Sequence, residues 1–308
     1  MGKNLKGIDI SEFQRNVDFK KVKNEVDFVY IRATYGRFGI DKRFEEYAKG
    51  CIENNIPFSF YYYSYATDLE KAEAEVKFFL EKVKEYKDKI SFPLMIDMED
   101  SDGYKLKNGN PEKELLTDIC IKACEKIAEE HFIPIIYASC DWFTNRLNFE
   151  KLGTYLKWIA WWGIEEEKID KNKYTMWQYS SKGKVSGIEG NVDLDYSFVD
   201  FIKLKEYTEN VSKLNYIKSV TFFSDIVLQF ITCYKWGKEA VDKLYNGLKT
   251  KDKLVYKECS LDEKKKAIKK YFGFEQKTID FFSNFIYAED FFKLLYNAIC
   301  GLTLEIKE

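Results

Sequence analysis

The stretch Phe92-Pro93-Leu94-Met95-Ile96-Asp97-Met98-Glu99-Asp100 joins an apolar run of strand length to three acidic residues. Because strand side chains alternate between faces, we expect Asp97 and Glu99 to point one way and Met98 and Asp100 the other. Two neighbouring acids at the end of a buried strand repel each other, and this repulsion raises the pKa of at least one of them. The pattern favours a carboxyl group that keeps its proton near neutral pH beside an ionised one. A strand that simply ends in a solvated acidic turn would give the same pattern.

Composition describes a globular chain. Of its 308 residues, 45% are hydrophobic and 17% aromatic, which is enough for one large and one small domain or for two medium ones. A net charge of -2 argues against a nucleic-acid partner held by its phosphates. No run near the N-terminus is long enough to span a bilayer, and no signal-peptide core precedes Gly7. We therefore expect no membrane span and no signal peptide, with synthesis in the cytoplasm.

Cysteine and histidine usage argues against a metal or a cofactor. Seven cysteines are scattered along the chain, and Cys120 and Cys124 lack the histidine or second cysteine pair that would complete a zinc site. Reduced, buried thiols are the preferred interpretation. The single histidine, His131, excludes an ordinary two-histidine site and makes a Ser-His-Asp triad a poor hypothesis. The sequence predicts no metal and no cofactor.

Eight short apolar segments are predicted to be strands, and the first five alternate with helical patterns. Such alternation is typical of a parallel sheet, and eight strands suggest closure into a barrel. The last three strands have little helix between them, so the predicted fold class is α/β, an irregular TIM-like (β/α) barrel. The predicted strands span 5–10, 28–31, 58–63, 92–97, 133–137, 158–162, 175–179 and 192–195.

Polar and aromatic side chains gather at the predicted carboxyl ends of these strands, where barrels bind their ligands. Four carboxylates, one cation, one amide and several aromatic rings are expected to converge on one mouth. Aromatic rings stack on the apolar faces of sugars, although each ring taken singly also suits the core. The candidate residues are Asp9, Arg32, Tyr61, Tyr63, Asp97, Glu99, Tyr137, Trp161, Gln178 and Asp193.

The character of the chain changes after Phe201. The charged segment 203–212 is interpreted as a linker, and 213–308 as a small all-α domain of about four helices. One apolar stripe runs from Ile217 to Ile231. Ser260 with Glu263 predicts a capping box for a helix that Gly273 ends, and Thr278 is predicted to cap the last helix. Near the barrel, Thr67 with Glu70 predicts a similar box.

Several motifs, taken in order over residues 1–201, resemble the glycoside hydrolase family 25 lysozymes of the Chalaropsis type. A lone Asp-x-Glu would mean little, but the ordered set is specific. The motifs are Gly7-Ile8-Asp9-Ile10-Ser11, Tyr30-Ile31-Arg32-Ala33-Thr34, Phe60-Tyr61-Tyr62-Tyr63-Ser64-Tyr65-Ala66, Asp97-Met98-Glu99, Trp158-Ile159-Ala160, Trp177-Gln178-Tyr179-Ser180-Ser181 and Gly190-Asn191-Val192-Asp193-Leu194-Asp195.

The resemblance implies an N-acetylmuramidase that cuts the β-1,4 bond between N-acetylmuramic acid and N-acetylglucosamine in peptidoglycan. It implies that Glu99 is the general acid, that Asp97 is its partner, and that Asp9 and Asp193 complete an acidic floor. It also implies substrate contacts from Arg32, Tyr61, Trp161 and Gln178, to which the strand positions add Tyr63 and Tyr137. Whether Asp97 attacks the sugar directly or assists the sugar's own N-acetyl group is open at this point.

Lysozymes of this kind often carry a C-terminal module that binds the cell wall. By position, 213–308 is a candidate wall-binding domain, and self-association through an exposed helix is equally compatible. The absence of a signal peptide resembles a phage endolysin of a Gram-positive host, released through a holin. The sequence therefore predicts peptidoglycan as the partner.

Two other hypotheses compete with a peptidoglycan hydrolase. A wall-binding protein with a degenerate barrel has no reason to keep all four acids, and this sequence has them. A metal-dependent phosphoesterase could use an acidic cluster, but the sequence lacks the histidines and the phosphate-cradling glycines that such sites use.

Overall fold

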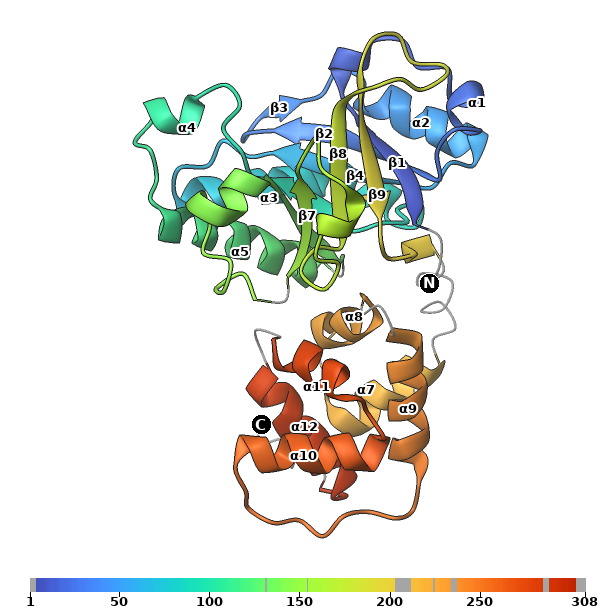
Figure 1. Cartoon of the computed structure of the whole chain (residues 1–308), viewed down its shortest axis with the longest axis vertical. Helices are drawn as coiled ribbons and strands as arrows, with labels where there is room; N and C mark the ends of the chain where they lie inside the picture. Colours follow the sequence, from blue (N-terminus) through green and yellow to red (C-terminus); the bar gives the residue numbers. More distant parts are fainter. Residues whose placement is uncertain are drawn as a thin grey trace. The chain divides into compact units, whose positions relative to one another are not determined.

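A computed structural model describes residues 4–302, except 131, 154, 203–211, 224, 234–236 and 285–287. Its contacts divide the chain into residues 1–202 and 203–308, and each unit is described by itself (Figure 1). Most of the predicted linker 203–212, and also His131, lie outside the described residues. No helix in the described ranges is both long and apolar enough to cross a membrane.

The first unit is built around a closed sheet. Its strands follow the order β1-β9-β8-β7-β6-β5-β4-β2, and pairing of β1 with β2 closes the ring, so the predicted barrel of eight strands is confirmed. The short ninth strand, β3, pairs with β2 outside the ring. The strands are β1 (Leu5–Ile10), β2 (Phe28–Tyr35), β3 (Gly39–Ile40), β4 (Phe58–Tyr63), β5 (Leu94–Asp97), β6 (Pro134–Ser139), β7 (Leu156–Ala160), β8 (Met176–Gly183) and β9 (Val192–Ser197).

One strand of the ring runs against the others. Successive pairs from β1 through β2 and β4 to β8 are parallel, whereas β9 is antiparallel to both β8 and β1. The parallel sheet predicted from the alternation of strands and helices therefore extends from β1 to β8, and β9 departs from it. The reason is the connection: only residues 184–191 separate β8 from β9, and a parallel crossover needs a dozen residues or more.

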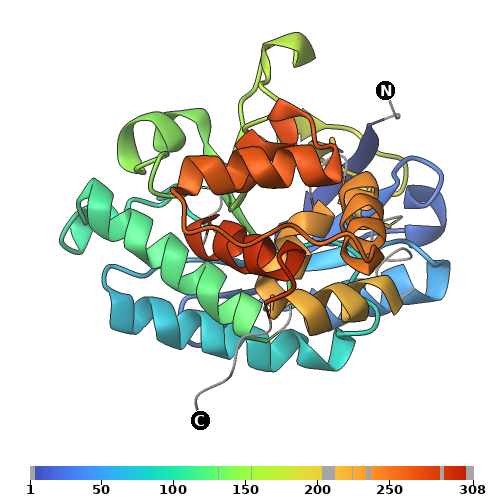
Figure 2. The same cartoon turned by 90° about the horizontal axis from the view of Figure 1, so that it is seen from below.

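Strand alternation gives the barrel two different faces. Outward residues such as Ile8, Ile31 and Ile96 join an apolar core beneath the helices. Figures 1 and 2 show α3 and α5 side by side outside the strands. The longer helices are α2 (Phe44–Asn54), α3 (Leu69–Val83) and α5 (Lys113–Glu129), and the shorter ones are η1 (Glu12–Gln14), α1 (Phe19–Val22), η2 (Lys84–Tyr86), α4 (Tyr104–Lys107), the π-helical η3 (Trp142–Arg146) and η4 (Glu166–Lys168).

The inward face is aromatic and polar. Tyr30 and Trp158 are fully buried inside the ring with their rings 4.6 Å apart, and the Tyr30 hydroxyl donates to the carbonyl of Pro93 (2.9 Å). The Ser59 hydroxyl donates to the same carbonyl at 2.8 Å. Because the Pro93 carbonyl accepts both hydroxyls, the barrel can hold Tyr30 and Ser59 below its mouth.

Helix starts show where local patterns mislead. Helix α3 is capped by Asp68 and not by Thr67: the Asp68 carboxylate accepts the N–H of Lys71 at 2.8 Å, while the Thr67 hydroxyl accepts from the Lys71 ammonium. A carboxylate at the N-cap outcompetes a neighbouring hydroxyl because it also interacts with the helix dipole.

The second unit is all-α over the residues described. Six helices appear there instead of about four: α7 (Ser212–Thr221), α8 (Asp225–Cys233), α9 (Gly237–Lys249), α10 (Leu261–Phe272), α11 (Gln276–Ser283) and α12 (Ala288–Ile299). The Ile217–Ile231 stripe is divided between α7 and α8, because Phe222 has a φ of 59° and ends the first helix. The Ser260/Glu263 box and the Gly273 stop are confirmed, but Thr278 lies inside α11, whose N-cap is Glu275.

Candidate active site

The barrel brings the four predicted acids to one end of the strands. Asp9 and Asp193 face each other directly across the β1–β9 pair. Asp97 ends β5, in register with Tyr63 on one side and Tyr137 on the other. Burial raises the pKa of Asp9 most, and the negative charges of Asp193 and Glu99 raise it further.

Alternation holds past the end of β5. Asp97 lies on the inward face, and Met98 is fully buried in the outer core. Asp100 turns elsewhere: its carboxylate accepts the backbone N–H groups of Lys105 (2.7 Å) and Leu106 (2.9 Å) in α4. Asp100 therefore holds the loop that follows the acids.

Glu99 is half-buried at the mouth. Burial raises its pKa to about 7, Asp193, Asp102 and Asp100 add to the rise, and Lys105 opposes it. A carboxyl group with this pKa is protonated over part of the neutral range and can donate to a leaving group. The partial burial of Glu99 therefore favours a functional carboxyl over a solvated acidic turn.

A hydrogen-bond relay fixes Asp9. The side-chain amide of Gln178 donates to Asp9 Oδ2 at 2.8 Å. The Gln178 oxygen accepts from the Tyr137 hydroxyl (3.0 Å) and from the indole N–H of Trp162 (3.1 Å). Because both of these donors need an oxygen, the amide can point only one way. Gln178 and Tyr137 thus lie beside the acids as predicted, and their contact with substrate stays a prediction.

Trp162 was not among the predicted residues, whereas its neighbour Trp161 was. The Trp162 ring is 54% exposed and donates to Gln178, so it lies at the edge of the acidic cluster. Trp161 is 37% exposed, and its backbone is tied to β8 through its N–H to Gln178 (3.1 Å). A substrate contact from Trp161 stays a prediction. The paired tryptophans in the sequence were the signal for Trp162.

A fifth acid, Asp195, lies below the others. It is fully buried inside the ring, where its carboxyl group interacts with Asp9 and with the indole of Trp158. Burial, followed by the charges of Asp9 and Asp193, raises its pKa well above the ordinary value for aspartate. Its position two residues after Asp193, on the same strand face, was the signal that the sequence prediction missed.

Arg32 is already paired. Its guanidinium contacts Asp41 (Nε–Oδ2 2.9 Å) and Glu12 (Nη2–Oε1 3.3 Å), and it lies 5.1 Å from the centre of the Phe13 ring. Its charge still reaches the cluster, because it lowers the pKa of buried Tyr61, which burial and then Asp9 raise. Both residues thus adjoin the acids, and their roles as substrate contacts stay predictions.

Tyr63 supports the loop after Glu99. Its hydroxyl lies 3.1 Å from the Ser101 hydroxyl and also accepts the Ser101 N–H at 3.1 Å. The Tyr65 hydroxyl donates to Asp102 at 2.8 Å, with the Tyr65 ring 4.9 Å from that of Tyr63. These aromatic residues form a wall beside the acids, as sugar binding would require.

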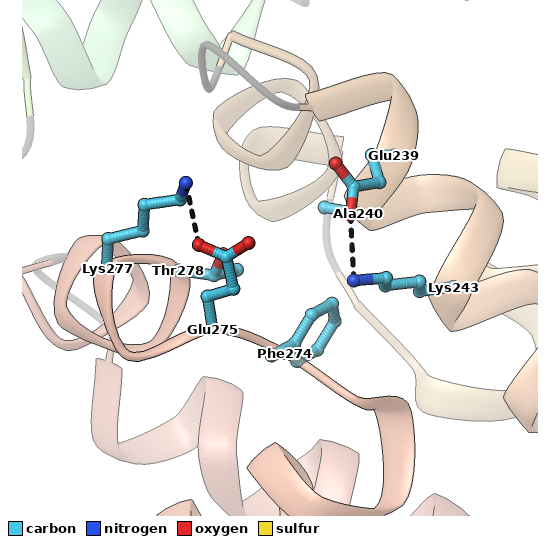
Figure 3. Close-up of a pocket in the computed structure, with 7 residues that line it drawn as sticks. All are labelled: Glu239, Ala240, Lys243, Phe274, Glu275, Lys277 and Thr278. Carbon is cyan, nitrogen blue, oxygen red and sulfur yellow. Dashed lines mark ion pairs between the residues drawn. The ribbon is translucent and has the colours of Figure 1, made fainter.

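Within the described residues, no group of three or more His, Cys, Asp or Glu could hold a metal ion. The helical unit carries a small, shallow hollow between α9 and the start of α11 (Figure 3). Two ion pairs occupy its rim, Lys243–Glu239 at 2.8 Å and Lys277–Glu275 at 2.7 Å. These side chains neutralise each other, so the hollow offers no reactive cluster like that of the barrel.

A barrel mouth that holds a half-buried carboxyl of raised pKa among several acids and aromatic rings is typical of acid-catalysed hydrolases. The profile of the family Glycosyl hydrolases family 25 matches residues 8–188. The chain therefore belongs to the family 25 glycosyl hydrolases, a muramidase family.

Relatives and solved structures with lysozyme, autolysin or endolysin descriptions are consistent with this family. The chain is 29% identical over 192 residues to the autolytic lysozyme of Clostridium acetobutylicum, covering 62% of this chain and 55% of the relative. It resembles the modular autolysin LytC of Streptococcus pneumoniae, solved with a synthetic peptidoglycan ligand (TM-score 0.58, 26% identity, 64% of this chain, 48% of the other). It also resembles the catalytic domain of endolysin ply40 from bacteriophage P40 of Listeria monocytogenes (TM-score 0.56, 25% identity, 66% and 97%). The chain spans about half the length of the first two.

Proposed function

We propose that this chain is a peptidoglycan hydrolase, an N-acetylmuramidase that cleaves the β-1,4 bond between N-acetylmuramic acid and N-acetylglucosamine. The observation that carries the proposal is Glu99, a half-buried carboxyl with a pKa raised to about 7 at the mouth of a family 25 barrel. Lysozyme and autolysin relatives support the choice of substrate.

The proposed reaction begins with proton transfer. Glu99 gives its proton to the glycosidic oxygen, the bond from the anomeric carbon to that oxygen breaks, and the N-acetylglucosamine side leaves as an alcohol. Positive charge then develops on the muramic acid ring. Carboxylates around the mouth stabilise this positive charge. They do so whether Asp97 attacks the anomeric carbon itself or orients the acetamido group of the sugar for that attack. Water completes the hydrolysis and returns a proton to Glu99.

The experiment that tests this function is digestion of purified Gram-positive peptidoglycan, followed by identification of the new reducing ends. Muramidase action leaves reducing N-acetylmuramic acid. Reducing N-acetylglucosamine would show the wrong bond to be cut, and no new reducing ends, with walls still bound, would favour the alternative of a wall-binding protein with a degenerate barrel.

The pH profile gives a further prediction. Catalysis needs Glu99 protonated, and burial holds its pKa at about 7, so kcat/KM is expected to fall as pH rises through about 7. The measurement is the initial rate of peptidoglycan cleavage between pH 4 and 9 at constant ionic strength. An alkaline limb near 4.5, the ordinary glutamate value, would contradict this assignment of the acid.

We further propose that the helical unit targets the protein to the wall, as C-terminal modules do in lysozymes of this kind. A chain ending at Ile202, where the two units divide, is expected to cleave soluble glycan fragments at the full-length rate but to clear intact walls more slowly. Sedimentation with walls is the direct measurement. Equal clearing by both forms would contradict targeting, and a dimer of the full chain in ultracentrifugation would favour self-association instead.

The likeness to a Listeria phage endolysin supports a proposal about release: the enzyme is a phage endolysin that reaches the wall through a holin. The autolysin relatives keep a host-encoded autolysin as the alternative. Production in bacteria with and without a co-expressed holin tests the proposal. We expect lysis only with the holin, and lysis without it would contradict this route.

A further inference from the structure

A buried cation next to the acids has no part in the reaction as described so far. Lys105, on α4, is fully buried, and its ammonium donates to the backbone carbonyls of Ser64 and Glu99, the latter at 2.7 Å. Among the described residues, no carboxylate oxygen lies within 4.0 Å of the Lys105 ammonium, the distance that defines an ion pair. Since a buried ammonium is costly unless it is well partnered, a neutral side chain would serve packing better.

The two carbonyls show what Lys105 joins. Ser64 follows β4 and Glu99 follows β5, and the Ser64 N–H itself donates to the carbonyl of Asp97 at 3.1 Å. The Asp100 carboxylate accepts the backbone N–H of Lys105 at 2.7 Å, while the Lys105 ammonium donates to the Glu99 carbonyl. These two hydrogen bonds link the start of the segment 99–105 to its end. The ammonium therefore fixes the backbone from which the Glu99 side chain extends.

Acidic groups surround this cation from several elements. Glu75 of α3 is buried, accepts from the Ser64 hydroxyl (2.8 Å) and the Tyr65 N–H (3.1 Å), and has its pKa raised to about 7 by burial. The groups that act electrostatically on Lys105 are Asp97, Glu75, Asp100 and Cys120, and those that act on Glu99 are Lys105, Asp193, Asp102 and Asp100.

Two aromatic rings complete the surroundings of the ammonium. It lies 5.4 Å from the centre of the Tyr63 ring and 5.9 Å from that of Trp142, within the range of cation–π attraction. These rings exclude water, so the charge is weakly screened where it faces the acids. After burial, Lys105 is the largest influence on the pKa of Glu99, and it lowers that pKa.

We propose that Lys105 is a positioning residue for glycan cleavage, which tethers the Glu99 backbone and faces the Glu99 carboxylate with a positive charge once its proton has left. The inference rests on the proposed function. When the proton moves to the leaving oxygen, Glu99 becomes an anion among other acids. Lys105 stabilises that anion without touching the substrate, so its contribution belongs to kcat more than to KM.

Three variants of the full chain separate charge from tether. Lys105→Met removes both, Lys105→Gln removes the charge but keeps an N–H donor for the carbonyls, and Lys105→Arg keeps the charge. The measurements are kcat and KM on soluble peptidoglycan fragments from pH 4 to 9, with thermal unfolding of each variant. The difference in kcat between Lys105→Met and Lys105→Gln measures the contribution of the hydrogen bonds to the carbonyls.

Loss of the positive charge raises the pKa of Glu99, so the alkaline limb of kcat/KM should move up by about one pH unit in both neutral variants. At the optimum, kcat should fall about tenfold, the equivalent of one pKa unit of interaction, with KM little changed. Lys105→Arg should keep the wild-type limb.

The proposal is overturned if Lys105→Gln folds and its alkaline limb stays at the wild-type position, because a merely structural lysine would lower activity without moving that limb. If Lys105→Met does not fold, the Gln and Arg variants still decide. A wild-type chain that produces no reducing ends would instead overturn the proposed function, and so the two failures are distinguishable.

Discussion

Glu99→Gln is expected to lower the rate of peptidoglycan cleavage by about a thousandfold, within the range that general acid catalysis contributes. Glutamine keeps the size of the side chain and can still donate an N–H, but it has no proton to give to the glycosidic oxygen. The measurement is release of reducing ends from purified walls. The matched control is Glu112→Gln, because Glu112 is exposed at the start of α5 and should be replaceable without loss.

The same substitution should stabilise the barrel at neutral pH. The pKa of Glu99 rises from 4.5 to about 7 on folding, so the folded state binds the proton more tightly and loses stability as pH rises between those values. Glutamine has no charge to bury, and it should raise the free energy of unfolding by roughly 1–3 kcal/mol at pH 8. A Glu99→Gln variant that cleaves walls at the wild-type rate would place the acid elsewhere.

Asp97→Asn is expected to lower kcat by at least about a hundredfold, the usual cost of losing one electrostatic contribution to a transition state. Asp97 is buried with its Oδ1 atom unpartnered, and burial followed by the charge of Glu99 raises its pKa well above the ordinary value. In its ionised form, Asp97 would stabilise the positive charge that develops on the sugar in the transition state. Asparagine has the same shape but cannot do so.

The measurement for Asp97→Asn is kcat and KM on soluble fragments, with Asp141→Asn as the control. Asp141 is exposed beside η3, and asparagine keeps an oxygen that can accept the hydrogen bond from Asn145. We expect the loss to fall on kcat, since charge stabilisation is needed only in the transition state. A rise in KM with unchanged kcat would instead make Asp97 a residue that binds the substrate in its ground state.

Much of the barrel follows from local sequence. Each predicted strand overlaps an observed one, because apolar residues on both faces of a strand give a strong local pattern. The direction of β9 does not follow from it. The predicted strands left residues 180–191 between them, enough for a crossover, whereas β8 in fact continues to Gly183 and shortens the connection. Strand ends are set by pairing across the sheet, which a local pattern does not contain.

The site residues likewise include some that local sequence could predict and some that it could not. Asp9 and Asp97 could be placed at one mouth because each lies near the carboxyl end of its strand on the inward face. Asp193 lies instead at the start of β9, and it reaches the same mouth because β9 runs antiparallel. Lys105 could not be placed there, since nothing near it in sequence indicates burial and its partners include the carbonyl of Ser64, 41 residues away. The Gln178–Asp9 bond spans 169 residues. Such contacts depend on the closed barrel and become visible only when it is assembled.

The antiparallel pairing of β9 with β1 also decides where the chain enters and leaves the barrel. Leu5 pairs with Ser197 at one end of these strands, and Asp9 pairs with Asp193 at the other. Entry and exit are thus neighbours, and four residue steps, about 13 Å, separate them from the acids. Phe201 still packs against Phe92 of the barrel unit, so recombination can exchange the chain that follows Ile202 without rebuilding the acidic site. The position of its exit therefore lets the barrel unit be fused to a different C-terminal domain at a distance from the acids.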